Sequence, residues 1–259
     1  AVEGAFGPID VWVNNAMASV FSPIKQMTAA EFKRVTEVTY LGYVYGTLSA
    51  LQRMLPRDRG HIIQVGSALT HRSIPLQSAY CAAKHAVLGF TESLWSELIH
   101  DKSNVHVSVV QMPAVNTPQF GWVKSRLPRK AQPVPPIYQP EAAAHAIVWT
   151  ADHPRRELFV GYPTVKTVIG EKFVPGFIDK YLSEHGYDSQ QTEEPEDPNR
   201  PDNLWAPLPG DHGAHGQFDQ RVVRQGSAVW KTTHRELFGA AVAILGGGIA
   251  ALALSAARR

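Results

Sequence analysis

The stretch HIIQVGSALTHRSIPLQSAYCAAKHAVLGF, residues 61–90, decides the fold class of this 259-residue chain. Its first five residues, 61–65, are mostly apolar and β-branched, and they lead into Gly66-Ser67, as a strand does where it emerges into a loop. From about residue 78 to residue 100 the pattern is that of a long helix. A buried strand, a loop and a helix form the repeating unit of a parallel α/β sheet.

Strand and helix patterns alternate on both sides of this stretch. Further strands are expected at 9–13, 105–112 and 158–160. Further helices are expected at 28–55, where Thr28-Ala-Ala-Glu31 forms a capping box, and at 141–150. The alternation predicts an α/β fold with a doubly wound parallel sheet of the Rossmann type.

The composition excludes several classes of protein. A formal net charge of +2, without a basic stripe interleaved with aromatic residues, argues against a nucleic-acid partner. Cys81 is the only cysteine, which excludes an intramolecular disulfide and a multi-cysteine metal cluster and fits a reducing compartment. We therefore expect neither nucleic-acid binding nor a metal site.

The last quarter of the chain differs from the rest. Residues 188–203 contain six acidic residues, one arginine and three prolines, too polar a composition to build a core. We therefore expect a catalytic domain at 1–187 and a disordered linker at 188–234.

The 21 consecutive uncharged residues 237–257 match a helix across a bilayer core of roughly 30 Å. A hydrophobic C-terminal helix at 235–259 is expected to anchor the chain in a membrane, the alternative being a helix docked on the domain or on a partner subunit.

Ser67, Tyr80 and Lys84 are the candidate catalytic residues of the central stretch. Tyr80 and Lys84 lie one helical turn apart and share a helix face. The ammonium is expected to favour the phenolate and to lower the pKa of Tyr80 from about 10 toward neutral pH. Such a tyrosine can act as general acid or base, and the Ser67 hydroxyl can bind the reacting oxygen.

This spacing resembles that of the short-chain dehydrogenase/reductase family. The resemblance implies an oxidoreductase that transfers hydride between a nicotinamide cofactor, NAD or NADP, and an alcohol or carbonyl. It also implies that Tyr80 is the acid or base, that Ser67 orients the substrate oxygen, and that Lys84 holds the nicotinamide ribose as well.

Two further segments match the family in the expected order. Asn14-Asn15-Ala16 resembles its Asn-Asn-Ala-Gly turn, with Met17 in place of glycine. PAVNT, residues 113–117, resembles the Pro-Gly segment ending in a threonine that meets the nicotinamide carboxamide, with alanine in place of glycine. The resemblance covers roughly residues 7–161. The implied cofactor-binding residues are Asn14, Ala16, Lys84, Pro113, Val115 and Thr117.

The chain also departs from the family pattern. Thr39 stands where an asparagine usually helps to hold a water on the proton relay, so its hydroxyl is expected to take that catalytic role or, alternatively, to bond a carbonyl one turn earlier. No strand, Gly-x-x-x-Gly turn and helix precede Ile9 to receive a pyrophosphate. We therefore expect a fragment that lacks N-terminal strand-helix units of roughly 80 residues.

Other classes of function fit fewer features of the sequence than an oxidoreductase does. A non-catalytic, membrane-tethered remnant that serves as a binding module is the main alternative, and coding sequence for a glycine-rich strand-turn-helix ahead of Ala1 would argue against it. A Ser/His/Asp hydrolase is disfavoured because Ser67 lacks a Gly-x-Ser-x-Gly turn and His71 is only four residues away. His212 and His215 are fewer ligands than zinc normally needs.

The sequence also bears on substrate and setting. Six bulky apolar residues lie where the family has its mobile substrate loop: Phe120, Trp122, Leu127, Val134, Ile137 and Tyr138. They favour a lipophilic alcohol or carbonyl as substrate. The alternative is that these side chains cover the core of the domain. The helices at 28–55 and 78–100 correspond to family oligomer contacts, which implies a homo-oligomer. The C-terminal anchor predicts a membrane-attached protein with its catalytic domain in the cytoplasm, with a soluble cytoplasmic protein as the alternative.

Overall fold

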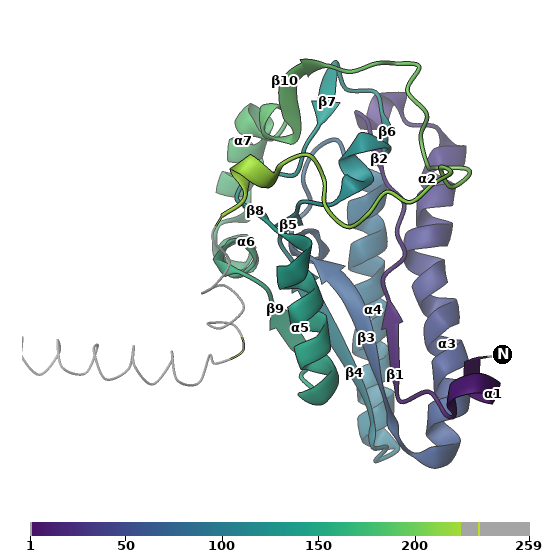
Figure 1. The fold of residues 1–259 in the computed structure, drawn as a ribbon. Helices are drawn as coiled ribbons and strands as arrows, with labels where there is room; N and C mark the ends of the chain where they lie inside the picture. Colours follow the sequence, from purple (N-terminus) through teal and green to yellow (C-terminus); the bar gives the residue numbers. More distant parts are fainter. Residues whose placement is uncertain (1, 224–232, 234–259) are drawn as a thin grey trace, which may run out of the picture.

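The computed structural model describes residues 2–223 and Thr233 (Figure 1). The strands are β1 (Val11–Asn14), β2 (Val20–Phe21), β3 (Gly60–Ser67), β4 (Val105–Met112), β5 (Ala114–Val115), β6 (Lys124–Ser125), β7 (Arg129–Ala131), β8 (Ile137–Tyr138), β9 (Glu157–Phe159) and β10 (Gln191–Pro195). The α-helices are α1 (Val2–Phe6), α2 (Ala29–Thr36), α3 (Gly42–Met54), α4 (Ser78–His100), α5 (Pro140–Asp152), α6 (Tyr162–Phe173) and α7 (Pro175–His185). The short turns are η1 (Ile24–Gln26), η2 (Glu37–Leu41), η3 (Leu55–Arg57), η4 (Ala68–Thr70), η5 (Pro118–Gly121), η6 (Asp188–Gln190) and η7 (Asp219–Arg221).

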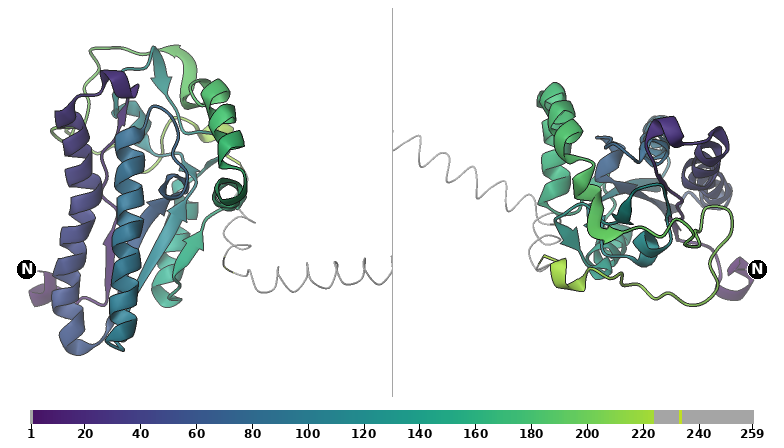
Figure 2. Two further views of the ribbon diagram at one scale, coloured as in Figure 1. Left: turned by 180° about the vertical axis from the view of Figure 1, so that it is seen from behind. Right: turned by 90° about the horizontal axis from the view of Figure 1, so that it is seen from above.

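A four-stranded parallel sheet in the order β1-β3-β4-β9 forms the centre of the fold. Each crossover passes through a helix and adds its strand on the same side of the previous one. Helices α3 and α4 cover one face of the sheet and α5 covers the other (Figures 1 and 2). The predicted α/β class, with its parallel sheet, is confirmed, and the four expected strands are those of the sheet.

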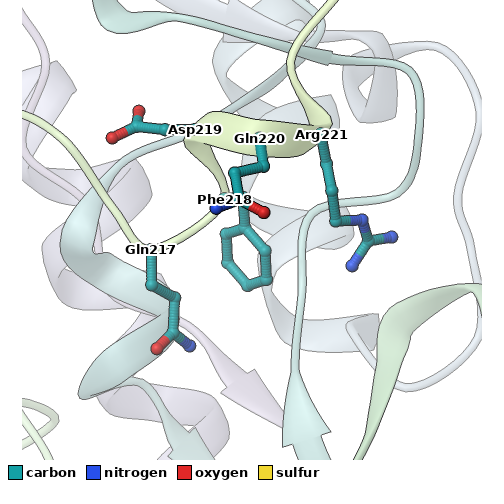
Figure 3. A pocket seen from close by; sticks show the side chains of 5 residues that line it. All are labelled: Gln217, Phe218, Asp219, Gln220 and Arg221. Carbon is teal, nitrogen blue, oxygen red and sulfur yellow. The ribbon is translucent and has the colours of Figure 1, made fainter.

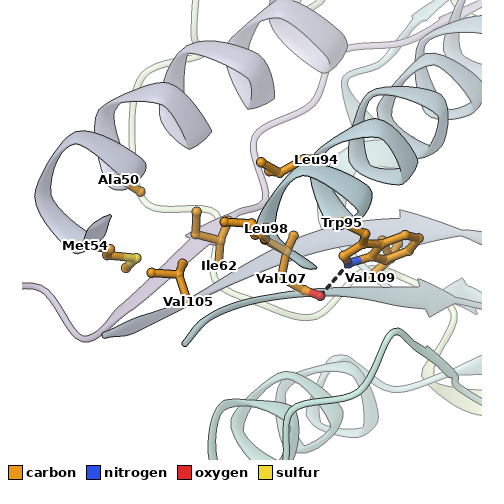
Figure 4. Close-up of a cluster of buried hydrophobic side chains, with 9 residues drawn as sticks. All are labelled: Ala50, Met54, Ile62, Leu94, Trp95, Leu98, Val105, Val107 and Val109. Atoms are coloured by element: carbon orange, nitrogen blue, oxygen red, sulfur yellow. Dashed lines mark hydrogen bonds between the residues drawn. The ribbon is translucent and has the colours of Figure 1, made fainter. Parts of the chain in front are cut away.

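Alternate residues of β4 build the two layers of the core. Val105, Val107 and Val109 pack against apolar side chains of α3 and α4 (Figure 4). In the same layer the Trp95 indole Nε1 donates a hydrogen bond to the Val107 carbonyl at 2.7 Å, so its buried N–H is satisfied. Val110 belongs to the opposite layer, which packs against α5. This alternation is the expected consequence of a strand that is buried on both faces.

The helix expected at 28–55 begins at the predicted capping box but is interrupted. The Thr28 hydroxyl accepts from the Glu31 amide at 3.3 Å, and the Glu31 carboxylate accepts from the Thr28 amide at 2.9 Å. The helix then passes through η2, a π-helical turn, before α3 continues. A π turn inserts an extra residue into the helix and often marks a functional site. Thr39 lies within it.

Short strands lie above the carboxyl ends of the central strands (Figure 1). Three pairs, β2 with β6, β5 with β8, and β7 with β10, come from segments that are distant in sequence. Part of the proline-rich stretch at 117–140, which was expected to be irregular, therefore forms strands.

The predicted linker is wrong for the part of it that the structure describes. Residues 191–195 form β10, which pairs antiparallel with β7, and the Lys130 ammonium contacts the Glu194 carboxylate at 2.6 Å. Leu204 is fully buried in a cluster with Val20. A polar strand can pair at a sheet edge through backbone hydrogen bonds and opposite charges alone. Residues 191–195 are therefore ordered although their polar composition suggested disorder.

The rest of the predicted linker, apart from Thr233, and the predicted hydrophobic helix at 235–259 lie outside the described residues. Within 2–223 and Thr233, no helix combines the length and the apolar character needed to cross a bilayer.

Candidate active site

Ser67, Tyr80 and Lys84 come together at the carboxyl end of the sheet. Ser67 is the last residue of β3, and the other two lie in the first turns of α4. Lys84 Nζ lies 5.6 Å from the centre of the Tyr80 ring, and the Ser67 side chain acts on the Tyr80 phenol by lowering its pKa. Ser67 and Lys84 are buried and Tyr80 is half-buried. One strand and one helix therefore hold all three predicted catalytic residues.

Burial shifts the protonation of Tyr80 in the direction opposite to the expected one. Desolvation raises the pKa of the phenol, the hydrogen bond with Ser67 lowers it by less, and neighbouring Cys81 adds to the rise. Lys84 does not overcome this effect, because its own desolvation lowers the lysine pKa to about 7. Tyr80 is therefore protonated at neutral pH and able to donate a proton.

The Lys84 amine makes two hydrogen bonds in this site. Nζ donates to the Val65 carbonyl at 2.6 Å and to the Tyr43 hydroxyl at 3.0 Å. The Tyr43 hydroxyl donates in turn to the same Val65 carbonyl at 3.0 Å. An ammonium has three N–H groups, so these two bonds leave one for a ligand.

Thr39 ties the π turn to the segment after β1. The side chain is fully buried. Its hydroxyl donates to the Ala18 carbonyl and accepts from the Ala18 amide, both at 2.9 Å. The acceptor is thus Ala18 and not a carbonyl one helical turn earlier. The predicted contact with a relay water stays a prediction, in which Thr39 would act as acceptor because its one proton is already donated.

Asn14 has its side chain engaged inside the fold. Its amide Nδ2 donates to Gln64 Oε1 at 2.9 Å and to Thr47 Oγ1 at 3.1 Å, and its Oδ1 accepts from the Trp12 indole at 2.8 Å. These bonds join β1 to β3 and α3. Ala16, by contrast, is exposed just beyond the end of β1. A nucleotide would therefore meet this turn through its backbone and not through the Asn14 amide.

The predicted carboxamide-binding residues follow β4 at the same edge of the sheet. Pro113, Val115 and Thr117 are half-buried. Val115 belongs to β5, which pairs in parallel with β8. The strand pair therefore holds the backbone of this segment in place.

Asn116, within this segment, binds residues that come from the predicted linker. Its Oδ1 accepts from the Phe218 amide at 3.1 Å, and its Nδ2 donates to the Asp219 carboxylate at 2.8 Å. Residues 217–221 line a cavity of about 410 Å³ (Figure 3). The segment next to the predicted cofactor site is therefore covered by a late part of the chain.

Gln111 positions Ser67 and was not singled out from the sequence. Its Oε1 accepts from the Ser67 amide and its Nε2 donates to the Glu157 carboxylate, both at 2.9 Å. Gly66 permits this approach, because a Cβ there would lie 2.2 Å from Gln111 Oε1. Although desolvation raises the pKa of Glu157, hydrogen bonds from His71 and Gln111 hold it below its usual range. A buried polar residue in an otherwise apolar strand was the available signal.

The donor groups fit one end of a nicotinamide dinucleotide. Lys84 offers an N–H group, and Thr117 a half-buried hydroxyl, at the edge of the sheet where ligands of this fold class bind. The described residues contain no glycine-rich turn from a strand into a helix N-terminus that would receive the pyrophosphate. The fit therefore extends to the nicotinamide ribose and its carboxamide.

Comparisons with known proteins agree on one family. The family model described as short chain dehydrogenase matches residues 1–126. An uncharacterized oxidoreductase of Bacillus subtilis, YxnA, is 32% identical over 239 residues, which cover 92% of this chain and 67% of the relative. The 17-beta-hydroxysteroid dehydrogenase 13 of Rattus norvegicus is 30% identical over 183 residues, 70% of this chain and 59% of the relative's own length. The crystal structure of a short-chain dehydrogenase from Streptomyces avermitilis aligns with a TM-score of 0.56 and 26% identity, over 73% of each chain.

Proposed function

Since the chain belongs to the short-chain dehydrogenase family, we propose that it carries the catalytic residues of an oxidoreductase acting on an alcohol or carbonyl with NAD or NADP. The observation that carries the proposal is the meeting of Ser67, Tyr80 and Lys84 at the carboxyl end of one strand and the start of one helix.

The proposed roles follow from the chemistry of the three groups. In the reductive direction the Tyr80 hydroxyl donates its proton to the carbonyl oxygen of the substrate, and the Ser67 hydroxyl holds that oxygen. A bound nicotinamide cofactor supplies the hydride that adds to the carbonyl carbon. Lys84 stabilises the phenolate that Tyr80 becomes, because a nearby positive charge favours that anion. The raised pKa of Tyr80 means that the phenol still carries its proton at neutral pH, before the transfer takes place.

The same site accounts for part of the cofactor binding. We propose that Lys84 and Thr117 contact the nicotinamide ribose and carboxamide, and that the backbone near Ala16 and along Pro113–Val115 lines that end of the cofactor. These 259 residues supply no glycine-rich turn for the pyrophosphate ahead of the first strand. We therefore expect the isolated chain to bind NAD(H) and NADP(H) weakly in calorimetry, and micromolar affinity would contradict this part of the proposal.

Substitution of the proposed proton donor tests the function. Tyr80→Phe removes the hydroxyl and keeps the ring, and we expect the rate of carbonyl reduction to fall by about a hundredfold or more, because the proton transfer is lost. The rate is followed through oxidation of the reduced nicotinamide. Tyr45→Phe is the matched control, since Tyr45 is 63% exposed on the surface of α3. Equal rates for Tyr80→Phe and the control would refute the proposed role.

The proposed substrate class is lipophilic. The name of the rat relative refers to a hydroxysteroid, and Phe120 is half-buried, with its ring 6.2 Å from the ring of Phe21. Leu127, Ile137 and Tyr138 are buried and belong to the packing of the domain. We expect steroid-like, retinoid-like or long-chain carbonyls to be turned over faster than small polar polyols, and the reverse order would refute this preference.

The proposed setting depends partly on residues 235–259, which lie outside those described. We propose that 235–259 attaches the protein to a membrane with the catalytic domain in the cytoplasm, and that the helices around 28–55 and 78–100 support a homo-oligomer. Fractionation of cells tests the attachment: the full chain should need detergent for extraction, whereas a variant without 237–259 should not. Full solubility of both would exclude a membrane anchor.

A further inference from the structure

Tyr43 is the residue on α3 whose side chain reaches Lys84. It lies four residues after Thr39, one helical turn further along the interrupted helix. The Thr39 hydroxyl bonds Ala18 on both its donor and its acceptor side, at 2.9 Å. The Tyr43 hydroxyl instead accepts from Lys84 Nζ at 3.0 Å. The direct link between this helix and the lysine therefore passes through Tyr43.

The Lys84 amine, the Tyr43 hydroxyl and the Val65 carbonyl form a closed triangle of hydrogen bonds that is buried from solvent. Tyr43 and Lys84 are 1% and 2% exposed. Both donate to the Val65 carbonyl of β3, Lys84 at 2.6 Å and Tyr43 at 3.0 Å. Lys84 Nζ also lies 4.6 Å from the centre of the Tyr43 ring, within the range of a cation–π contact. Three elements, α3, β3 and α4, thus meet at one amine.

A buried ammonium needs acceptors for its N–H groups, because burial removes it from bulk water. Among the described residues, no carboxylate lies within ion-pair distance of Lys84, so the Val65 carbonyl and the Tyr43 hydroxyl are its recorded acceptors. Val65 contributes a backbone oxygen that any residue would supply. Of these two acceptors, only the Tyr43 hydroxyl belongs to a side chain, so only this acceptor is lost when the residue is substituted.

We infer that Tyr43 is a positioning residue for the proposed reaction: its hydroxyl, together with the Val65 carbonyl, holds the amine of Lys84 beside Tyr80. The described contacts give the position of Tyr43 beside Lys84, and the catalytic purpose of that position rests on the proposed function. The sequence singled out Thr39 in this helix for holding a relay water, whereas the direct contact with Lys84 comes from Tyr43.

The titratable side chains that face the amine are Tyr43 from α3 and Tyr80 from its own helix, and β3 presents a carbonyl. Desolvation lowers the pKa of Lys84 to about 7. An acceptor stabilises the protonated amine, so loss of the Tyr43 hydroxyl favours the neutral form. Tyr43→Phe should therefore lower the pKa of Lys84 further.

The test measures the ionisation of Lys84 in the protein without cofactor or substrate. ¹³C-labelled lysine is titrated by NMR, and the Lys84 resonance is assigned by its loss in Lys84→Met. We expect the midpoint for Lys84 to fall by about one pH unit in Tyr43→Phe, the effect of one hydrogen bond to a charged group. Tyr45→Phe, a hydroxyl removed from an exposed tyrosine, should leave the midpoint unchanged. An unchanged midpoint in a folded Tyr43→Phe protein would overturn the inference.

A second measurement needs no substitution at Tyr43 and covers the case in which that variant does not fold. The ¹³Cζ resonance of Tyr43 in the unsubstituted protein should shift with the same midpoint as Lys84, because its oxygen accepts a hydrogen bond from the amine. A Tyr43 resonance that ignores the titration of Lys84 would also overturn the inference. Both readouts are independent of turnover, so a failure of the proposed oxidoreductase activity is seen separately in the Tyr80→Phe assay.

Discussion

Desolvation sets the protonation states of Tyr80 and Lys84, two of the proposed catalytic residues. It raises the pKa of the Tyr80 phenol and lowers that of the Lys84 amine to about 7. At neutral pH the phenol therefore carries its proton, while the amine is close to half-protonated. Of these two groups, the lysine is the one whose charge changes with small changes of pH around neutrality.

The buried lysine predicts a pH dependence of stability. The pKa of Lys84 is about 7 in the folded protein and about 10.4 in an unfolded chain, so between these values the unfolded chain binds more protons. Stability of the unsubstituted protein, relative to Lys84→Met, should therefore rise as the pH increases from about 7 to about 10 and be constant below that range. Urea unfolding of both proteins across this range measures the difference. A difference that does not change with pH would show that the folded pKa is close to its ordinary value.

At the scale of the elements, close approach of α3 to β1 depends on Gly46. A Cβ at this position would lie 2.3 Å from Asn14 Oδ1 and 3.0 Å from Trp12 Nε1. Helix α3 can therefore come this close to β1 only because residue 46 is a glycine. This contact holds the asparagine network that joins β1, β3 and α3.

A pair of glycine substitutions tests this contact. Gly46→Ala should destabilise the protein by about 1–3 kcal/mol, because the added methyl group displaces the asparagine network. Gly89→Ala is the matched control in the interior of α4, where an added Cβ meets nothing within 4 Å. It should stabilise the protein by about 0.5–1 kcal/mol, since alanine favours a helix over glycine. Chemical denaturation measures both, and equal effects of the two substitutions would contradict the argument.

At the scale of the whole molecule, Arg72 connects the loop after Ser67 to two peripheral helices. Its guanidinium bonds Glu171 of α6 at 2.7 Å and Asp179 of α7 at 2.5 Å, and its own side chain is mostly buried. Seen from above, α6 and α7 lie at the opposite end of the molecule from α1 (Figure 2). One side chain thus links the loop that follows Ser67 to both α6 and α7.

Removal of this arginine should loosen α6 and α7. In Arg72→Met we expect amide hydrogen exchange in these two helices to become about tenfold faster, since charge-assisted bonds worth about 1.5–3 kcal/mol are lost. Exchange in α4 should change little, because its core contacts remain. Lys33→Met, which removes an exposed pair with Glu37, serves as control. Unchanged exchange in α6 and α7 would mean that packing alone holds them.

The candidate site was predictable only in part. Ser67, Tyr80 and Lys84 could be named because their spacing along one strand and one helix is local information. Tyr43 and Gln111 come from other elements. In the sequence Gln111 differs from its neighbours only as a polar residue within a strand, and Tyr43 does not differ from an ordinary core residue. Their contacts depend on which strand lies beside which, and hence on pairing across the sheet.

The sequence by itself determined the alternation of strands and helices, the parallel sheet and the spacing of Tyr80 and Lys84, because apolar periodicity and a one-turn separation act within a single element. Only the tertiary structure decided the direction of the Tyr80 pKa shift, the partners of Lys84 and the pairing of β10 with β7. Desolvation, acceptor geometry and the pairing of polar strands all arise between segments that are distant in sequence, and no local pattern specifies them.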